Sequence, residues 1–444
     1  MDRIINRRLF FEITGAGIAG YFLSPVDTFA QAGSYQSDAL ILNTAKYVIF
    51  IQLAGAPSQI DTFDLKVGPW TPSDFAPTTI NGVDFPEGLM PSLASQAGRF
   101  SIVRSCQSNA LVHSLLQAWN QIARNPASAT GKIAPNIGSV VALEFEPKRS
   151  RSQKLPGFVS LASAGNLVRN GYLPGQYAPF DVNVGPTGLA NLTNGDGEAT
   201  FTDRYNVLQQ LNAGGIRRSD FEEMAEFYAG ARAMMYDPTV TATFRFTSDD
   251  QLKYGNSGFG NACIVARNLV TADLGTRYIM ITLGGWDNHQ NIYQQNAGIY
   301  RPARQLDAAL GNLIADLAVI PGADGRSKLD ETLIVAKGEF GRTVGTLTNQ
   351  SGRDHYFVHS SLFAGGGVRA GKVIGTTTAD GRFIETPGWS EDRAVTPEDI
   401  AATIYSALGI NYTTTRRDDP LGRGFEYVPS NTGWRISPLR ELFY

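Results

Sequence analysis

Lys46-Tyr-Val-Ile-Phe-Ile-Gln-Leu-Ala54 is a nearly continuous apolar run, and Gly55-Ala-Pro57 ends it. A run of this length without alternation is typical of a parallel strand buried on both faces. Three more runs have a similar form, the last with more alternation: Arg277-Tyr-Ile-Met-Ile-Thr-Leu283, Thr332-Leu-Ile-Val-Ala336 and Arg99-Phe-Ser-Ile-Val-Arg104. These runs predict the strands of a mostly parallel sheet.

Helical patterns separate the strands. Apolar residues recur at helical spacing in three segments: Phe221, Met224, Tyr228 and Met235 behind the capping box Ser219-Asp-Phe-Glu222; Leu306, Leu310, Leu313 and Leu317; and Ile400, Ile404 and Leu408 behind Thr396-Pro397. Residues 176–215 are rich in Gly, Asn and Thr and predict a long loop or small insertion. Strands alternating with amphipathic helices predict an α/β layered fold with a mostly parallel sheet.

Composition excludes several classes of protein. The 444 residues carry 38 Lys and Arg against 41 Asp and Glu, a net charge of −3, so a nucleic-acid partner is not expected. Cys106 and Cys263 are the only two cysteines, which excludes a disulfide framework and a cysteine-based zinc site but leaves one disulfide open. After the N-terminal region, no segment is apolar enough for a stable membrane span.

The N-terminus has the features of an export signal. Arg7-Arg8 precede a moderately apolar, Gly-rich stretch over 13–23, and Ala30-Gln-Ala32 forms a small-residue cleavage site. The paired arginines resemble a twin-arginine motif, so the twin-arginine export machinery is an expected partner and the periplasm or the cell exterior the expected location. The alternative is a short membrane anchor or a buried helix. We expect a signal peptide at 1–32 and a single domain at 33–444.

Two of the four histidines lie in acidic turns that follow predicted strands. Gly284-Gly-Trp-Asp-Asn-His289 follows one strand, and Lys337-Gly-Glu-Phe-Gly-Arg-Thr343 with Ser351-Gly-Arg-Asp-His-Tyr356 follows another. Ligands bind beyond the carboxyl ends of parallel strands. These turns therefore offer five candidate metal ligands: Asp287, His289, Glu339, Asp354 and His355. Imidazole mixed with carboxylate favours Zn²⁺ or Mn²⁺, and carboxylates alone favour Ca²⁺.

Each of these residues also has a simpler interpretation. Asp and His after a strand often cap helices or bond the backbone, and Asp287 fits an Asx turn. His359, four residues after His355, fits either a further metal ligand or a plain surface residue. His113, in Leu111-Val-His-Ser114, fits a buried, hydrogen-bonded histidine. Arg342 and Arg353 offer forks that hold an anionic oxygen.

Familiar catalytic motifs are missing. The chain has no G-x-S-x-G elbow, and no P-loop or G-x-G-x-x-G follows a strand. Ala364-Gly-Gly-Gly-Val368 lacks a P-loop lysine and predicts a turn. Serine-hydrolase chemistry and nucleotide binding therefore find no support.

Several motifs together resemble a large bacterial family, number 1501 among the domains of unknown function. They are Gly55-Ala-Pro-Ser-Gln-Ile-Asp-Thr-Phe-Asp64, Met90-Pro-Ser-Leu-Ala94, Ile102-Val-Arg-Ser105, Gly284 to His289, Glu339-Phe-Gly-Arg-Thr343, Gly352-Arg-Asp-His355, Ala364 to Val368 and Asp399 to Gly409. The resemblance covers roughly residues 40 to 444. It implies a branch of the alkaline-phosphatase and sulfatase superfamily, with a three-layer sandwich and one or two divalent ions that serve ester hydrolysis.

The superfamily pattern is only partly matched. Asp287, His289 and His355 fall where the resemblance implies metal ligands, and Glu339 falls on the Asp of an Asp-His-Gly turn, where Phe340 replaces the histidine. The metal-binding Asp expected directly after the first strand is missing, since Asp61 comes several residues late. No sulfatase nucleophile motif is present, which leaves one metal site and these candidates for the nucleophile region: Ser105, Cys106, His113 and Ser114.

Two functions follow from the sequence. The first is an exported hydrolase of phosphate or sulfate esters, with a small-molecule or carbohydrate substrate, one Zn, Mn or Ca ion on the five ligands, and His113 and Arg342 as catalytic residues. The second is a non-catalytic metal- or ligand-binding cell-surface protein of the same fold.

Overall fold

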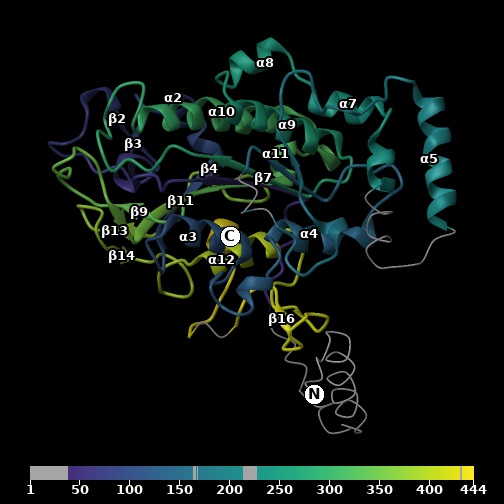
Figure 1. The fold of residues 1–444 in the computed structure, drawn as a ribbon. Coiled ribbons are helices and arrows are strands. Elements are labelled where there is room, and N and C mark those ends of the chain that lie inside the picture. Colours follow the sequence, from purple (N-terminus) through teal and green to yellow (C-terminus); the bar gives the residue numbers. More distant parts are fainter. Residues whose placement is uncertain (1–38, 164–166, 168, 214–227, 431–432) are drawn as a thin grey trace, which may run out of the picture. The chain divides into compact units, whose positions relative to one another are not determined.

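Three of the apolar runs form neighbouring strands at the centre of an eight-stranded sheet in the computed structural model (Figure 1). The structure describes residues 39–163, 167, 169–213, 228–430 and 433–444. The expected signal peptide at 1–32 and the expected capping box at 219–222 lie outside these residues and stay predictions.

The strand order is β12-β4-β11-β8-β1-β7-β5-β6. The strands are β1 (Tyr47–Leu53), β4 (Phe100–Gln107), β5 (Phe158–Leu161), β6 (Phe180–Val182), β7 (Tyr278–Leu283), β8 (Thr332–Lys337), β11 (Val358–Ala364) and β12 (Val373–Ile374). Among these strands β11 alone runs antiparallel to its neighbours, β4 and β8. β1 lies between β8 and β7, and every residue of β1 and β8 is buried, as their unbroken apolar runs predict.

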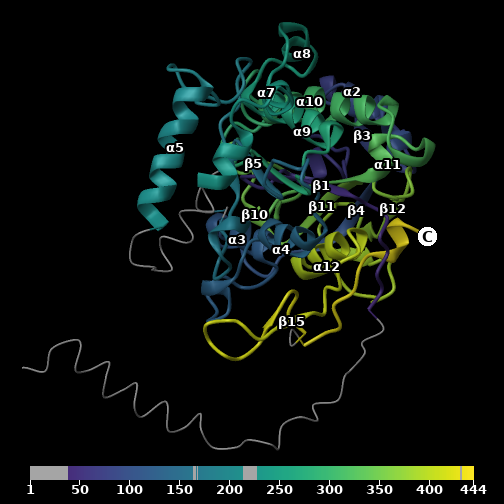
Figure 2. The same cartoon turned by 90° about the vertical axis from the view of Figure 1, so that its right-hand side faces the viewer.

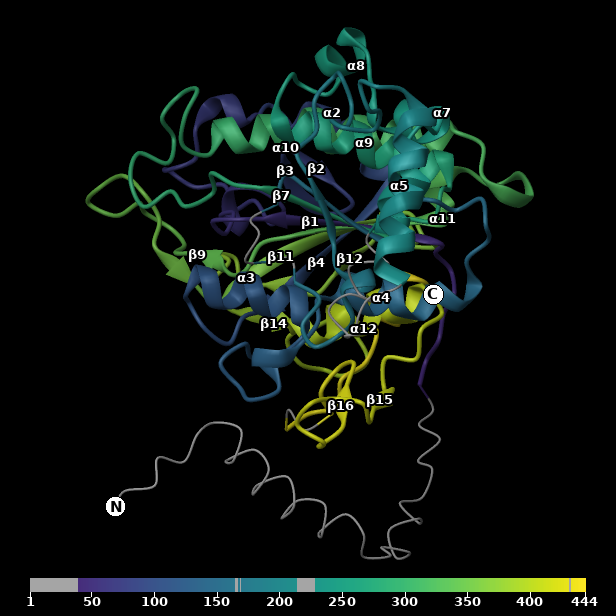
Figure 3. The same ribbon diagram turned by 45° about the vertical axis from the view of Figure 1, so that its right-hand side comes forward.

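Helices cover both faces of the sheet, so the expected three-layer α/β sandwich is confirmed (Figures 1 and 2). On one face lie α2 (Pro91–Ser95), α7 (Pro238–Phe244), α8 (Ser248–Lys253), α9 (Gly258–Ala272) and α10 (Tyr300–Val319). On the other lie α3 (His113–Ile122), α4 (Ile137–Phe145) and α12 (Pro397–Ala407), which Figure 3 shows beneath the sheet. The short α11 (Lys328–Glu331) leads directly into β8.

The two helices with clear sequence patterns form as predicted. The four leucines of the α10 stripe are all buried. In α12 the carboxylate of Asp399 accepts hydrogen bonds from the Thr396 amide at 2.9 Å and hydroxyl at 2.8 Å, which completes a capping box behind Pro397.

Two parts of the sheet region differ from expectation. The segment 176–215 is not only loop, because it contains β6 and α5 (Glu198–Ala213). α5 has no apolar stripe, so periodicity gave no signal for it. The run Val358 to Ala364 was not predicted as a strand, because its buried first half carries His359, Ser360 and Ser361.

Cys106 and Cys263 are both buried and free, so they form no disulfide. None of the described helices combines the length and the apolarity that crossing a membrane requires.

The parallel direction of β1, β7 and β8 brings the turns after these strands to one edge of the sheet. Two glycines allow these turns to touch. Gly55 has φ +107°, and a Cβ there would lie 2.6 Å from the amide nitrogen of Asp287. A Cβ on Gly352 would lie 2.0 Å from the carbonyl of His289. The acidic turns predicted from the sequence therefore pack directly against one another.

Candidate metal centre

Four side chains from three segments converge at this edge: His113, Asp287, His289 and His355. One ligand atom of each lies within 4.8 Å of the others. His113 is the first residue of α3, Asp287 and His289 follow β7, and His355 begins β10 (His355–Tyr356). Asp287 Oδ1 lies 3.0 Å from His289 Nε2, 3.2 Å from His113 Nε2 and 3.8 Å from His355 Nε2.

The other ring nitrogen of each imidazole donates to an acceptor behind it. His113 Nδ1 donates to Glu339 Oε1 at 2.6 Å, and His289 Nδ1 donates to Asp354 Oδ1 at 2.8 Å. His355 Nδ1 donates to the carbonyl of Leu111 at 2.9 Å. Because carboxylate and carbonyl oxygens only accept, each Nδ1 carries a hydrogen, and in the neutral imidazole each Nε2 then presents a lone pair.

Three lone pairs and one carboxylate oxygen therefore face one another. His289 Nε2 and His355 Nε2 lie 3.0 Å apart, and His113 Nε2 is buried without a hydrogen-bond partner. Arg342 donates to two of these four groups, to Asp287 Oδ1 at 2.6 Å and to His289 Nε2 at 3.4 Å, and a cation between the four would relieve the repulsion that remains. Histidines that ligate a metal typically donate their other ring N–H to a carboxylate or a carbonyl, so these residues fit a divalent ion.

Arg342 supplies the positive charge next to this group. Its Nη2 donates to Asp287 Oδ1 at 2.6 Å. The guanidinium also donates to the carbonyls of Gly55, Ala56 and Arg353, and its side chain is only 1% exposed. Burial acts to raise the pKa of Asp287, but the hydrogen bond and charge of Arg342 outweigh it and hold the pKa below its ordinary value. Arg342 thus fixes the turns and keeps Asp287 ionised.

Glu339 and Asp354 lie behind the imidazoles and not among the four converging residues. Glu339 is fully buried and also accepts from the amide of Gly55 at 2.9 Å and from Gln117 Nε2 at 2.9 Å. Asp354 is exposed. The sequence pattern named both as ligands because it could not tell a carboxylate facing the centre from one that orients a histidine.

Burial and nearby charges shift the pKa values of His113 and His355 in opposite directions. Burial lowers the pKa of His113, but the hydrogen bond and charge of Glu339 raise it above the ordinary histidine value. Burial, with the positive charge of Arg342, leaves the pKa of His355 below that value. Phe340 packs against both rings, with centroid distances of 4.7 Å to His113 and 4.5 Å to His355. Phe340 therefore cannot ligate but sets the positions of two imidazoles.

A second buried contact holds the turn that carries His355. Arg353 Nε donates to Asp61 Oδ2 at 2.7 Å, and neither side chain is exposed. Tyr293 donates to the other oxygen of Asp61 at 2.7 Å. Asp61, which comes too late after β1 to join the cluster, anchors this turn instead.

The remaining sequence candidates lie elsewhere. Ser105 is buried and donates to the carbonyl of Pro387 at 2.7 Å. Cys106 is fully buried, and this burial raises the pKa of its thiol to about 11. The thiol is therefore not ionised at neutral pH. His359 is buried in β11, which makes it neither a member of the cluster nor a surface residue. Ser114 is exposed on α3, next to His113.

The comparisons with known proteins identify a family. The sequence model of a family described as "Protein of unknown function (DUF1501)" matches residues 45–428. The family predicted from the motifs is thereby confirmed. No curated protein matches the sequence.

Several solved structures overlap with this chain. The lipoteichoic acid synthase of Listeria monocytogenes shares 12% identity, with 88% of this chain and 76% of that chain covered and a TM-score of 0.37. A putative sulfatase from Bacteroides thetaiotaomicron shares 11% identity, with 88% and 75% covered and a TM-score of 0.38. A member of the alkaline phosphatase superfamily from Vibrio parahaemolyticus shares 11% identity, with 84% and 68% covered and a TM-score of 0.37. Structural similarities with TM-scores and identities this low give no information about the activity of this chain.

Proposed function

We propose, from the premise that this chain belongs to the DUF1501 family, that it is an exported metal-dependent hydrolase of phosphate or sulfate esters. The observation that carries the proposal is the set of four acceptors, His113, Asp287, His289 and His355, that face one another with every imidazole already oriented from behind. These four residues would hold one divalent ion. Three nitrogen ligands and one oxygen ligand favour Zn²⁺ first and Mn²⁺ second.

When bound, a divalent ion supplies polarisation of an ester oxygen and a lowered pKa for water. The residues around it provide the rest. The Asp287 and His289 side chains are 49% and 39% exposed, so an ester can approach from their side. Arg342 adds a fixed positive charge that favours an anionic ester, although its burial keeps it from contacting one directly.

His113 with Glu339 also has the form of a general base. Glu339 fixes the Nδ1–H tautomer of His113, which leaves Nε2 with an unpartnered lone pair. A histidine oriented by a carboxylate in this way can accept a proton from water. We assign His113 to the ligand set and treat proton transfer by it as the alternative role.

A second function is a non-catalytic metal-binding protein. Two candidates of the nucleophile region favour it, because the Ser105 hydroxyl is hydrogen-bonded to a main-chain carbonyl and the Cys106 thiol is buried with a raised pKa. A small-molecule or carbohydrate ester remains the expected substrate class for the enzyme.

The test is metal analysis followed by hydrolysis. We expect the chain purified without chelator to contain about one divalent ion per molecule, and EDTA to lower its melting temperature because an ion that binds the native state stabilises it. Aryl phosphate and aryl sulfate should be hydrolysed when Zn²⁺ or Mn²⁺ is restored. Metal without hydrolysis of any ester would favour the binding protein, and protein without metal would overturn both functions.

Export is proposed from the sequence alone. Replacement of Arg7 and Arg8 by lysine should leave precursor inside the cell, because twin-arginine transport requires the arginine pair. Normal export of this double variant, measured by cell fractionation, would contradict the proposal.

A further inference from the structure

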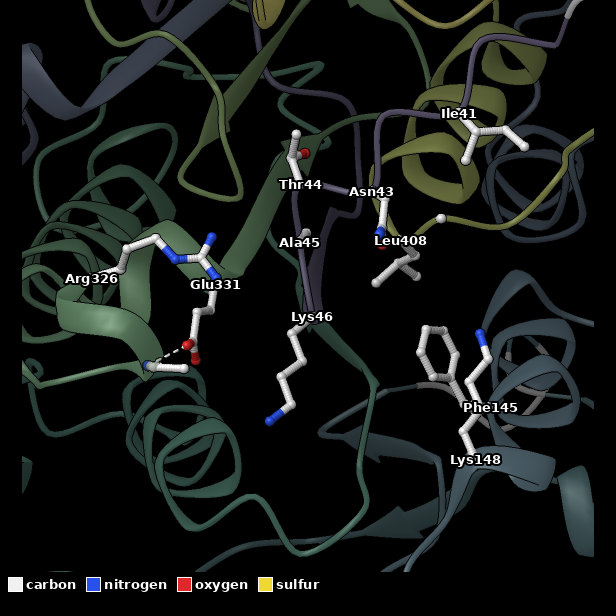
Figure 4. A pocket seen from close by; sticks show the side chains of 12 residues that line it. Ile41, Asn43, Thr44, Ala45, Lys46, Phe145, Lys148, Arg326, Glu331 and Leu408 are labelled. Carbon is white, nitrogen blue, oxygen red and sulfur yellow. Dashed lines mark hydrogen bonds between the residues drawn. The ribbon is translucent and has the colours of Figure 1, made fainter.

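A cavity of about 420 Å³ lies at the amino-terminal ends of β1 and β8, at the opposite edge of the sheet from the metal centre (Figure 4). The segment Ile41–Lys46 forms one side of it. Main-chain hydrogen bonds fix this segment: the amides of Leu42 and Asn43 donate to Ser406, that of Ala45 to Ala407, and that of Lys46 to Glu331. The volume lies within the range of small-molecule sites.

Three cations line the cavity against one carboxylate. Lys46, Lys148 and Arg326 come from three separate segments, and Figure 4 shows Arg326 and Lys148 on opposite sides. The carboxylate of Glu331 is already engaged, since Lys328 Nζ donates to it at 2.9 Å and the amide of Ala323 donates to its other oxygen.

Among the residues that the structure describes, two of these cations have no counter-ion. Lys46 pairs with Asp273 at 2.6 Å, but Asp273 also pairs with Arg277 at 2.7 Å. No carboxylate of the described residues lies within ion-pair distance of Lys148 or Arg326. The cavity therefore carries an excess of positive charge in a chain whose net charge is −3.

The same cavity has an apolar wall. Ile41 and Phe145 line it beside the cations, with Lys148 Nζ 4.8 Å from the centre of the Phe145 ring, and Leu408 also lines it but is only 2% exposed. Ile41 is 45% exposed, so it offers apolar surface that a ligand in the cavity can cover. A ligand that covers this wall gains free energy from burial of apolar surface in addition to charge attraction.

We propose that this cavity binds an organic anion, with a carboxylate or phosphoryl headgroup held by Arg326 and Lys148 and an apolar body packed on Ile41 and Phe145. Arginine holds either headgroup through paired N–H donors, and lysine adds a point charge. This site is separate from the metal centre, so it does not depend on the proposed hydrolysis.

Calorimetric titration of the full chain, stripped of metal with EDTA and then dialysed into chelator-free buffer, tests the site with four probes. Hexanoate and hexyl phosphate should bind, and the tighter of the two identifies the headgroup. Hexan-1-ol and inorganic phosphate should each bind about tenfold more weakly or not at all, because each lacks one of the two required parts. Equal binding by either would overturn the proposal, as would no binding by the two anions.

Variants locate the site. The double variant Lys148→Gln, Arg326→Gln should weaken the better probe by about tenfold or more, and Ile41→Ser by about threefold or more. Lys132→Gln is the matched control, because Lys132 is exposed but does not line the cavity. Binding that is unchanged in the double variant, or weakened equally by Lys132→Gln, would overturn the assignment, whereas loss of metal binding in other variants would leave it intact.

Discussion

The guanidinium of Arg342 donates to Asp287 Oδ1, the same oxygen toward which three imidazoles converge. One carboxylate oxygen thus has a permanent cation on one side and a group of lone pairs on the other. Arg342 cannot withdraw, because main-chain carbonyls hold it in place. In the proposed metal centre, the affinity for an ion should therefore depend on the residues that orient the ligands as well as on the ligands themselves.

Asp287→Asn should remove the negative ligand with almost no change of size. We expect metal affinity to fall by about 100-fold or more, since loss of even an outer contact costs about 10–100-fold. Equilibrium dialysis with Zn²⁺ measures this. Asp84→Asn, at an exposed position in the hairpin of β2 (Pro77–Ile80) and β3 (Val83–Pro86), is the control and should bind metal normally. Unchanged affinity in Asp287→Asn would remove Asp287 from the centre.

Glu339→Gln and Asp354→Asn should differ in stability. Each removes the charge behind one imidazole, so each should weaken metal binding by about 10–100-fold. Glu339 is fully buried and also accepts from Gly55 and Gln117, so its substitution should in addition cost about 1–3 kcal/mol of unfolding free energy. Asp354 is exposed, and its substitution should leave stability unchanged. Urea unfolding of the metal-free proteins separates the two; equal stability losses would contradict these roles.

His113→Gln distinguishes a ligand from a proton carrier. If His113 ligates, metal content and hydrolysis fall together. If it transfers a proton, metal content stays and the rate falls by about 10²–10⁴-fold, with loss of one limb of the pH profile. We expect the first result, because His113 Nε2 lies 3.2 Å from Asp287 Oδ1. Wild-type metal content and wild-type rate together would exclude both roles.

Asp61→Asn should strongly destabilise the fold. It leaves the guanidinium of Arg353 buried without its counter-charge, which typically costs about 3–5 kcal/mol. Arg353→Met alone should cost a similar amount, and the double variant should lose less than the sum because no charge is left unpaired. Simple additivity in urea unfolding would show that the pair does not act as a unit.

His359 should make the metal-free protein sensitive to acid. Burial, with the positive charge of Lys337, lowers its pKa from 6.5 to about 3. The unfolded chain then binds a proton that the folded chain does not, so stability is complete above pH 6.5 and falls as the pH drops toward 3, by up to about 1.4 kcal/mol per pH unit. The raised pKa of His113 acts in the opposite direction. Comparison with His359→Asn isolates the effect; an identical pH dependence in the variant would contradict it.

The fold could be predicted where the hydrophobic pattern of a segment fits only one kind of element. β1, β7 and β8 are apolar on both faces, and α10 and α12 carry unbroken stripes, so their existence followed from the sequence. β11 was missed because buried serines and a histidine look like loop residues until the partner strand that buries them is known.

For the site, the sequence predicted which residues lie close together but not which of them face the centre. The strand-end rule brought Asp287, His289 and His355 together, since it depends on strand direction alone. It could not decide on which side of an imidazole a carboxylate lies. Glu339 follows β8 directly and lies behind His113, and this depends on the position of α3, which no local pattern fixes.

The central strand β1 finds both neighbours late in the chain: Val48 pairs with Tyr278 on one side and with Leu333 on the other. β4 likewise pairs with a strand that is made much later, since Ile102 of β4 lies opposite Leu362 of β11. During synthesis the most apolar strand is therefore made early and stays without a partner until most of the chain has left the ribosome. Such non-local pairing slows folding and exposes strand edges to aggregation. We therefore expect a chaperone to bind the nascent chain at the segment Tyr47–Leu53.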